Sequence, residues 1–275
     1  MKIKDMFLRF WKSDNNKVSI ARDVVIALLA VFVILMLLWG YTGQWFAAPM
    51  VAIESGSMEH QPPNYPAAPF GRLGTIDAGD MVLVQKVMKR SDVVPHGGPI
   101  EGAQAQNGWQ SYGNYGDVII YKPMGRTDVS QIIHRAMCWV DVYQKDGETT
   151  YTILDYGVYN ATTLTIPQLG LHNRDPGWTQ SGFLTKGDNN EICDQISDIC
   201  PQPVLVSWIS GKARLEIPWL GAINLFFEDM LHGKNTVGNV HQDSLICLGI
   251  VIAILISIPI ILDVYDYLKK RKRAL

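Results

Sequence analysis

A serine that acts as a nucleophile needs a base within hydrogen-bond reach and donors for the developing oxyanion. The tetrapeptide Ser55-Gly56-Ser57-Met58 supplies two hydroxyl groups around a glycine. Taken alone, this tetrapeptide is better explained as a polar turn. Ser57 is therefore a candidate nucleophile whose interpretation depends on finding a base elsewhere in the chain.

His134 is the candidate base, because an imidazole has a pKa near neutrality and is the usual general base for serine. It follows two isoleucines in Ile132-Ile133-His134-Arg135, a strand-like apolar setting. A purely structural histidine is the alternative interpretation. In a Ser-Lys dyad, Lys86 or Lys122 would be the base instead. The other histidines lie in turn-like or polar sequence: His60, His96, His172, His232 and His241.

The candidate acid lies in the segment Thr185–Asn190, of sequence TKGDNN, or shortly after it at Asp194. An aspartate beside a catalytic histidine fixes the histidine tautomer and stabilises the imidazolium. The Gly-Asp-Asn-Asn sequence also forms tight turns without any catalytic role. Both Asp188 and Asp194 are therefore candidates.

Short strands rich in β-branched residues would position these groups. Turn-rich segments at 61–74 and 97–116 separate them, and the chain has no internal repeat, heptad pattern or alternating βαβ pattern. Short strands separated by turn-rich segments predict an all-β or β-rich domain. The clearest strand patterns are Met81–Val87, Asp117–Tyr121, Ile132–Tyr143 and Thr149–Leu154.

Two uncharged apolar runs, Val24–Tyr41 and Leu245–Leu262, are long enough to be membrane helices, since about 20 apolar residues span a bilayer core. A cleaved signal peptide is the alternative for the first run. Basic residues precede the first run and follow the second, which places both chain ends in the cytoplasm. These residues are Lys2, Lys4, Arg9, Lys12, Lys17 and Arg22 before, and Lys269–Arg273 after.

The predicted organisation follows from these runs. It comprises a cytoplasmic N-terminal segment at 1–22, a transmembrane helix at 23–48, an extracytoplasmic domain at 49–243, a second transmembrane helix at 244–262 and a basic cytoplasmic tail at 263–275. The formal net charge of −2 gives no reason to expect a nucleic-acid partner.

The cysteines raise the question of disulfides, which are permitted outside the cytoplasm. Cys193 and Cys200 could close a short loop that would restrain Asp194. The alternative is that both are reduced and buried, and Cys138 is a competing partner. Cys247 falls in the second apolar run, and no cysteine spacing resembles a zinc site.

Two further segments have open interpretations. The stretch from Arg214, of sequence RLEIPWLGAINLFFEDML, is either a core segment followed by a linker helix or a segment at the membrane interface. Asn160-Ala161-Thr162 matches the N-glycosylation sequon, a triplet that also arises by chance.

The order of these motifs resembles type I signal peptidase in its Ser-His-Asp form, as found in the endoplasmic reticulum and archaea. SGSM follows a membrane run, and the segments GDMVLV, GDVIIYKP, IIHR and TKGDNN then match the family's boxes in sequence, with an aspartate after the last. Bacterial members usually have lysine at the position of His134. Relative to compact members, this chain has extra length at Met88–Tyr115 and Val142–Gly182 and a second apolar run.

The resemblance implies a mostly β extracytoplasmic catalytic domain with two transmembrane helices. Ser57 would be the nucleophile and His134 the base, with Asp188 and Asp194 at the acidic positions and Asp194 slightly preferred as the partner of the base. The Ser55 hydroxyl and the Ser57 backbone N–H would form the oxyanion hole. No metal or organic cofactor is expected.

The implied activity is the removal of N-terminal signal peptides from secretory preproteins, with small residues before the cut. The expected partners are these preproteins and the lipid bilayer, with the translocon as a further candidate and no nucleic acid. The expected location is the cell membrane, or the endoplasmic-reticulum membrane in a eukaryote, with both termini cytoplasmic. Two alternatives remain: a non-catalytic anchored ectodomain that scaffolds the secretion machinery, and a processing peptidase with a narrow set of substrates.

Overall fold

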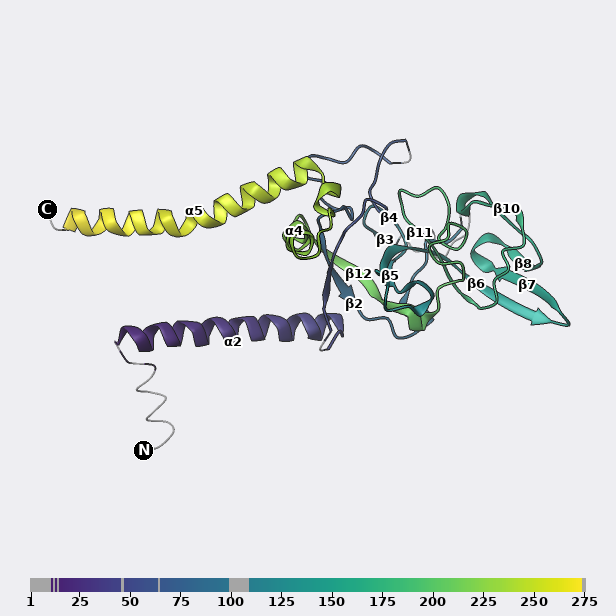
Figure 1. Ribbon diagram of the computed structural model, residues 1–275, viewed down its shortest axis with the longest axis horizontal. Helices are drawn as coiled ribbons and strands as arrows, with labels where there is room; N and C mark the ends of the chain where they lie inside the picture. Colours follow the sequence, from purple (N-terminus) through teal and green to yellow (C-terminus); the bar gives the residue numbers. More distant parts are fainter. Residues whose placement is uncertain are drawn as a thin grey trace, which may run out of the picture. The chain divides into compact units, whose positions relative to one another are not determined.

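The computed structural model describes residues 11, 13, 15–45, 47–63, 65–98 and 109–273 (Figure 1). The chain divides into two compact units between Pro49 and Met50. Most of the predicted N-terminal segment lies outside the described residues, including Lys2, Lys4, Arg9 and Lys12. Residues 99–108 of the extra segment at 88–115 and residues 274–275 of the tail also lie outside them.

The first unit contains the helix α2, Asn16–Thr42, which begins earlier and ends earlier than the predicted span at 23–48. The helix begins early because the Asn15 side chain caps it, accepting a hydrogen bond from the Lys17 backbone N–H at 3.0 Å. It ends at Thr42 because Gly43 adopts a left-handed conformation with φ of 68°.

The second unit is built on one antiparallel sheet with the strand order β1-β2-β12-β5-β6-β7-β8, in which β11 also pairs with β6. The four strand patterns expected from the sequence are confirmed as β2, β5, β6 and β7. The strands of this sheet are β1 Met50–Ala52, β2 Met81–Gln85, β5 Val118–Tyr121, β6 Ile132–Lys145, β7 Glu148–Ile153, β8 Val158–Ala161, β11 Gly182–Lys186 and β12 Ile209–Ile217.

Smaller elements complete this unit. Two two-stranded sheets are β3 Gln110–Ser111 with β4 Asn114–Tyr115, and β9 Leu164–Ile166 with β10 Leu171–Arg174. The 3₁₀ turns are η1 Arg90–Asp92, η2 Pro123–Gly125, η3 Leu154–Tyr156, η4 Pro167–Leu169, η5 Val206–Trp208 and η6 Val237–Asn239.

The extra segment Val142–Gly182 forms a β layer that shares its core with β6, β11 and Cys193. Its strands bury Tyr151 and Trp178, whose rings meet edge to face at 5.8 Å, together with Leu164 and Leu171. Figure 1 shows β7, β8 and β10 at the end of the unit opposite to α4 and α5. This layer therefore extends the sheet away from the helical end.

The stretch from Arg214 forms the end of β12 and then the helix α4, Gly221–His232. One side of α4 buries Ala222 and Leu225. The interfacial interpretation stays a prediction for the large apolar side chains that α4 leaves exposed: Phe226, Phe227, Met230 and Leu231.

The last helix, α5, runs from Gln242 to Arg273 and passes through Pro259 without ending. The predicted basic tail at 263–275 is thus helical as far as Arg273. Within the part of the chain that the structure describes, two helices are long and apolar enough to cross a membrane, Lys17–Thr42 with mean hydropathy 2.8 and Gln242–Arg271 with mean hydropathy 3.2. This favours association with a membrane.

The predicted Cys193–Cys200 disulfide is wrong for this structure, because both residues are free thiols. Their side chains pack in different cores. Cys193 joins Cys138 and the residues of the β7–β10 layer, whereas Cys200 packs with Phe183 and Val204. Asp194 must therefore be held by hydrogen bonds alone.

Candidate active site

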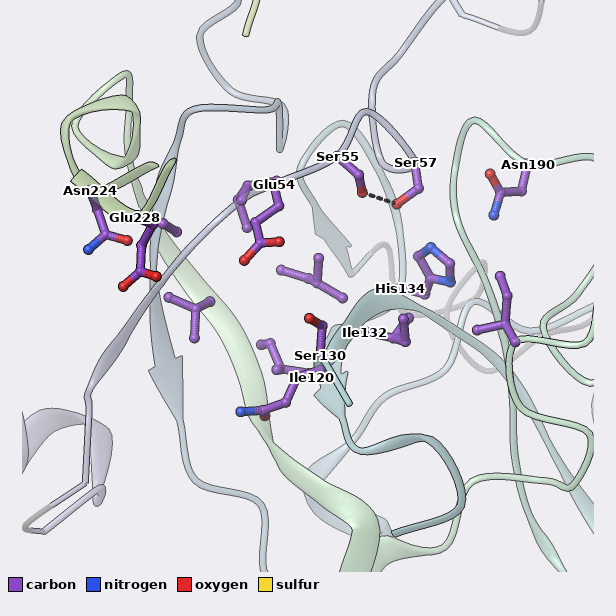
Figure 2. Close-up of a pocket in the computed structure, with 16 residues that line it drawn as sticks. Glu54, Ser55, Ser57, Ile120, Ser130, Ile132, His134, Asn190, Asn224 and Glu228 are labelled. Atoms are coloured by element: carbon purple, nitrogen blue, oxygen red, sulfur yellow. Dashed lines mark hydrogen bonds between the residues drawn. The ribbon is translucent and has the colours of Figure 1, made fainter. Parts of the chain in front are cut away.

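A cavity of about 750 Å³ opens beside the tetrapeptide that contains Ser57. Ser55, Ser57 and His134 all line it, as do Asn224 and Glu228 of α4. Figure 2 shows the two serine hydroxyls and the His134 ring gathered at one end, with the α4 side chains at the other. The structure thus brings the candidate nucleophile and the candidate base to one cavity.

His134 and Asp194 form a buried pair. The distance from His134 Nδ1 to Asp194 Oδ2 is 2.7 Å, and the two residues are 3% and 0% exposed. Since a carboxylate can only accept, Nδ1 carries a hydrogen, which in the neutral imidazole leaves the lone pair on Nε2. The Tyr121 hydroxyl at 2.8 Å and the Thr185 hydroxyl at 2.7 Å donate to the same oxygen.

The strands around Asp194 explain its position. The pairing of β11 with β6 shifts register between Leu184 and Thr185, which is how a β-bulge redirects a side chain. The Asp194 backbone N–H then donates to Thr185 O at 2.9 Å. Burial, together with the nearby charge of Asp194, raises the pKa of Tyr121 well above its usual value, so its phenol remains a donor.

Asp188 lies in a different network. It accepts hydrogen bonds from Arg135 Nε at 2.7 Å, Arg135 Nη2 at 2.5 Å and His60 Nε2 at 3.0 Å. Neighbouring residues of a strand point to opposite faces, so His134 and Arg135 meet different carboxylates. Although burial opposes ionisation, the hydrogen bonds and charge of Arg135, followed by His60, lower the pKa of Asp188 below its usual value.

The TKGDNN segment also holds the backbone of the serine turn. The Asn189 backbone N–H donates to Ser57 O at 2.9 Å, and Asn189 Nδ2 donates to Gly56 O at 3.1 Å. The approach is so close that a Cβ on Gly187 would lie 2.5 Å from Ser57 O. Any side chain at Gly187 would therefore clash with this turn and force it to shift.

The Ser57 hydroxyl makes its hydrogen bond to Ser55 Oγ, at 3.3 Å. A bond between Ser57 and His134 is not among the contacts of the described residues, and such bonds often tighten only when substrate binds. The alternative bases are less well placed: Lys86 is exposed, and neither Lys86 nor Lys122 lines this cavity.

The sequence interpretation missed several residues that support the site. Tyr121 and Thr185 hold Asp194 from β5 and β11. Both lie in the segments GDVIIYKP and TKGDNN, but nothing local to these segments indicates that they would meet the aspartate. His60, interpreted as a residue of a polar turn, is only 7% exposed and stacks on Tyr65 with ring centroids 3.7 Å apart. Its position directly after the SGSM tetrapeptide and Glu59 was the available signal.

The remaining predictions concern modification and metals. Asn160 lies in β8 with an exposed side chain, and its glycosylation stays a prediction. Among the described residues, no group of three or more His, Cys, Asp or Glu side chains is placed to hold a metal ion.

Comparison with known proteins finds no family model that matches this chain and no curated protein that matches it. Ser57 and His134 line one cavity, and Asp194 is hydrogen-bonded to His134 outside it. A serine, a histidine and an aspartate of this kind are the groups that carry out acyl transfer in serine hydrolases.

Proposed function

We propose that this chain is a membrane-bound serine endopeptidase that removes signal peptides from secretory preproteins. The observation that carries this proposal is the buried His134–Asp194 pair, with 2.7 Å between Nδ1 and Oδ2, beside the cavity that Ser57 also lines. Asp194 is the aspartate that orients the base. Asp188, already paired with Arg135, supports the serine turn.

In the proposed reaction, His134 Nε2 takes the proton from Ser57 Oγ while Oγ bonds to the scissile carbonyl carbon. The oxyanion is held by the Ser57 backbone N–H and the Ser55 hydroxyl, and Asp194 stabilises the imidazolium. His134 then gives its proton to the leaving amine as the peptide bond breaks. Water, activated by His134, hydrolyses the acyl-enzyme and restores the Ser57 hydroxyl.

The walls of the cavity support a peptide substrate with small apolar side chains near the cut. Part of the wall is aliphatic. These residues come from the segment containing β1, from β5, from the start of β6 and, for Ile199, from the chain after β11: Val51, Ile53, Ile120, Ile132, Ile133 and Ile199. Aliphatic walls exclude water from the reacting bond and favour small aliphatic groups.

The two apolar helices support a location at the membrane. We place both termini in the cytoplasm and the domain between the helices outside, as the positive-inside rule indicates. Anchoring raises the effective concentration of enzyme at the point where a membrane-held signal peptide emerges. Such a site would meet its substrates at the outer surface of the bilayer.

The test is cleavage of a labelled preprotein by the purified protein in liposomes, with the cut mapped by mass. The wild type should cut once, after small residues, and Ser57→Ala should leave the preprotein intact. Full cleavage by Ser57→Ala would overturn the proposal. A wild type that cleaves no preprotein yet binds translocon components would favour the scaffold alternative.

A further inference from the structure

The residues that lead into α5 contact both ends of the serine turn. Asn239 Nδ2 donates to Glu54 O at 2.8 Å, immediately before Ser55. His241 Nε2 lies 3.0 Å from Glu59 Oε2, on the other side of the tetrapeptide. The turn that carries the candidate nucleophile is therefore held at each end by one short segment.

Glu59 packs against the Ser55–Ser57 turn at Gly56. It is 3% exposed, its backbone N–H donates to Gly56 O at 3.2 Å, and a Cβ on Gly56 would lie 2.7 Å from its carboxyl carbon. Its Oε2 atom also accepts from Gln61 Nε2 at 2.8 Å and lies 3.7 Å from Arg72 Nη2. The Glu59 carboxylate therefore packs against Gly56 of the turn, and its polar partners Gln61 and Arg72 hold it there.

The segment between these contacts is firmly attached to α5 and to the sheet. Val240 is 7% exposed and packs in one cluster with Leu225 of α4 and Leu248 of α5. At the start of α5, Asp243 Oδ2 accepts from the Gly71 backbone N–H at 3.0 Å. Movement of α5 would therefore be transmitted to residues 239–241.

We propose that Asn239, His241 and Glu59 are positioning residues through which α5 holds the Ser57 turn against His134. The inference rests on the proposed peptidase function, and none of the three lines the cavity. The second apolar helix then contributes to catalysis itself, beyond attaching the domain to a membrane.

The first test is the turnover of His241→Leu in liposomes. A misplacement on the order of 1 Å can slow a reaction about 100-fold, so we expect kcat to fall at least tenfold. KM should stay within about twofold, because the cavity walls are unchanged. His241→Gln keeps an N–H donor and should restore most of kcat. The matched control, His172→Leu on exposed β10, should equal the wild type.

A double-mutant cycle tests whether the two groups act together. Because Glu59→Ala and His241→Leu remove the same contact, the double variant should lose no more activity than the worse single variant. Glu148→Ala, in exposed β7, is the matched control and should add nothing to His241→Leu. Losses that multiply in the Glu59–His241 double variant would contradict a shared role.

A second readout does not depend on cleavage. In a Ser57→Cys background, the alkylation rate of the introduced thiol by iodoacetamide, followed by peptide mass mapping, reports the position of the turn. Adding His241→Leu should change this rate severalfold, whereas His241→Gln should not. Unchanged alkylation and unchanged kcat in His241→Leu would overturn the inference while leaving the peptidase intact. Cleavage retained by Ser57→Ala would overturn the peptidase, and alkylation would still decide whether His241 holds the turn.

Discussion

Exchanging Asp194 for asparagine separates its charge from its shape. Three donors meet at Asp194 Oδ2, from His134, Tyr121 and Thr185, at 2.7, 2.8 and 2.7 Å. In Asp194→Asn the amide oxygen should take this place, because an NH₂ group there would face three donors. The histidine tautomer is then kept, and the stabilisation of the imidazolium is lost.

The size of the loss follows from the geometry of the pair. Two opposite charges about 4 Å apart attract by about 4 kcal/mol at an effective dielectric constant of about 20. Since about 1.4 kcal/mol corresponds to a factor of ten in rate, kcat should fall on the order of 10³-fold. KM should change little, because the charge develops only in the transition state.

Asp188→Asn is the matched comparison, and its effect should be on stability. It leaves the guanidinium of Arg135, which is 0% exposed, without its carboxylate. Breaking a buried ion pair costs about 3–5 kcal/mol. For a domain of this size the melting temperature should fall on the order of 10 °C. The remaining folded protein should keep kcat within about tenfold, because His134 retains Asp194.

The assay is preprotein cleavage under saturating substrate, with thermal unfolding of the same samples. Active-site concentration is taken from the folded fraction, so that unfolding does not count as a loss of kcat. The reasoning is refuted if Asp188→Asn lowers kcat as much as Asp194→Asn without a change in melting temperature. It is also refuted if Asp194→Asn is fully active.

Three further predictions follow from the same structure. His134→Ala should lower the cleavage rate on the order of 10⁴-fold, whereas Lys86→Ala should cleave normally because Lys86 is exposed and outside the cavity. The reverse pattern would indicate a Ser-Lys dyad. For topology, an impermeant thiol reagent on intact cells should label a cysteine placed at exposed Lys145 but not one at Lys269, and labelling of the latter would contradict the two-span arrangement. Burial, then the charge of Asp80, raises the pKa of Glu216 to about 8. An unfolded glutamate ionises near pH 4, so the stabilising contribution of protonated Glu216 is complete below about pH 4 and falls as the pH rises to about 8. Glu216→Gln should therefore raise the melting temperature at pH 8.5 by roughly 2–4 °C and leave it unchanged at pH 4.

The strands that the sequence predicted correctly share a strong local signal. β2, β5 and β6 are rich in valine and isoleucine, and β7 alternates threonine with larger residues. β8 and β9 lie between turns at Gly157 and Gly170, and β10 follows Gly170; each is only three or four residues long, too short for a clear local pattern, and their burial around Trp178 accompanies their formation. Caps likewise decided the ends of α2, since hydropathy alone cannot locate Asn15 and Gly43 as boundaries.

The candidate site likewise contains residues that local motifs predicted and contacts that no local motif could predict. Ser57, His134 and both aspartates carry motif-level signals, and the order of the motifs predicted that they would meet. Which aspartate faces His134 depended on the register of β11 against β6, a long-range property of the sheet. The contact between His241 and Glu59 joins residues 182 positions apart, which no local pattern reveals.

The buried cysteines have a consequence for the redox environment of the protein. Burial raises the pKa of Cys193 to about 12 and raises those of Cys138 and Cys200 as well, so little thiolate forms at neutral pH. Thiolate is the species that attacks disulfides, so exchange with glutathione or oxidoreductases should be slow at these positions. With all four cysteines free, the fold requires no oxidase or disulfide isomerase. The domain should therefore reach the same folded state in a reducing cytosol as in an oxidising compartment.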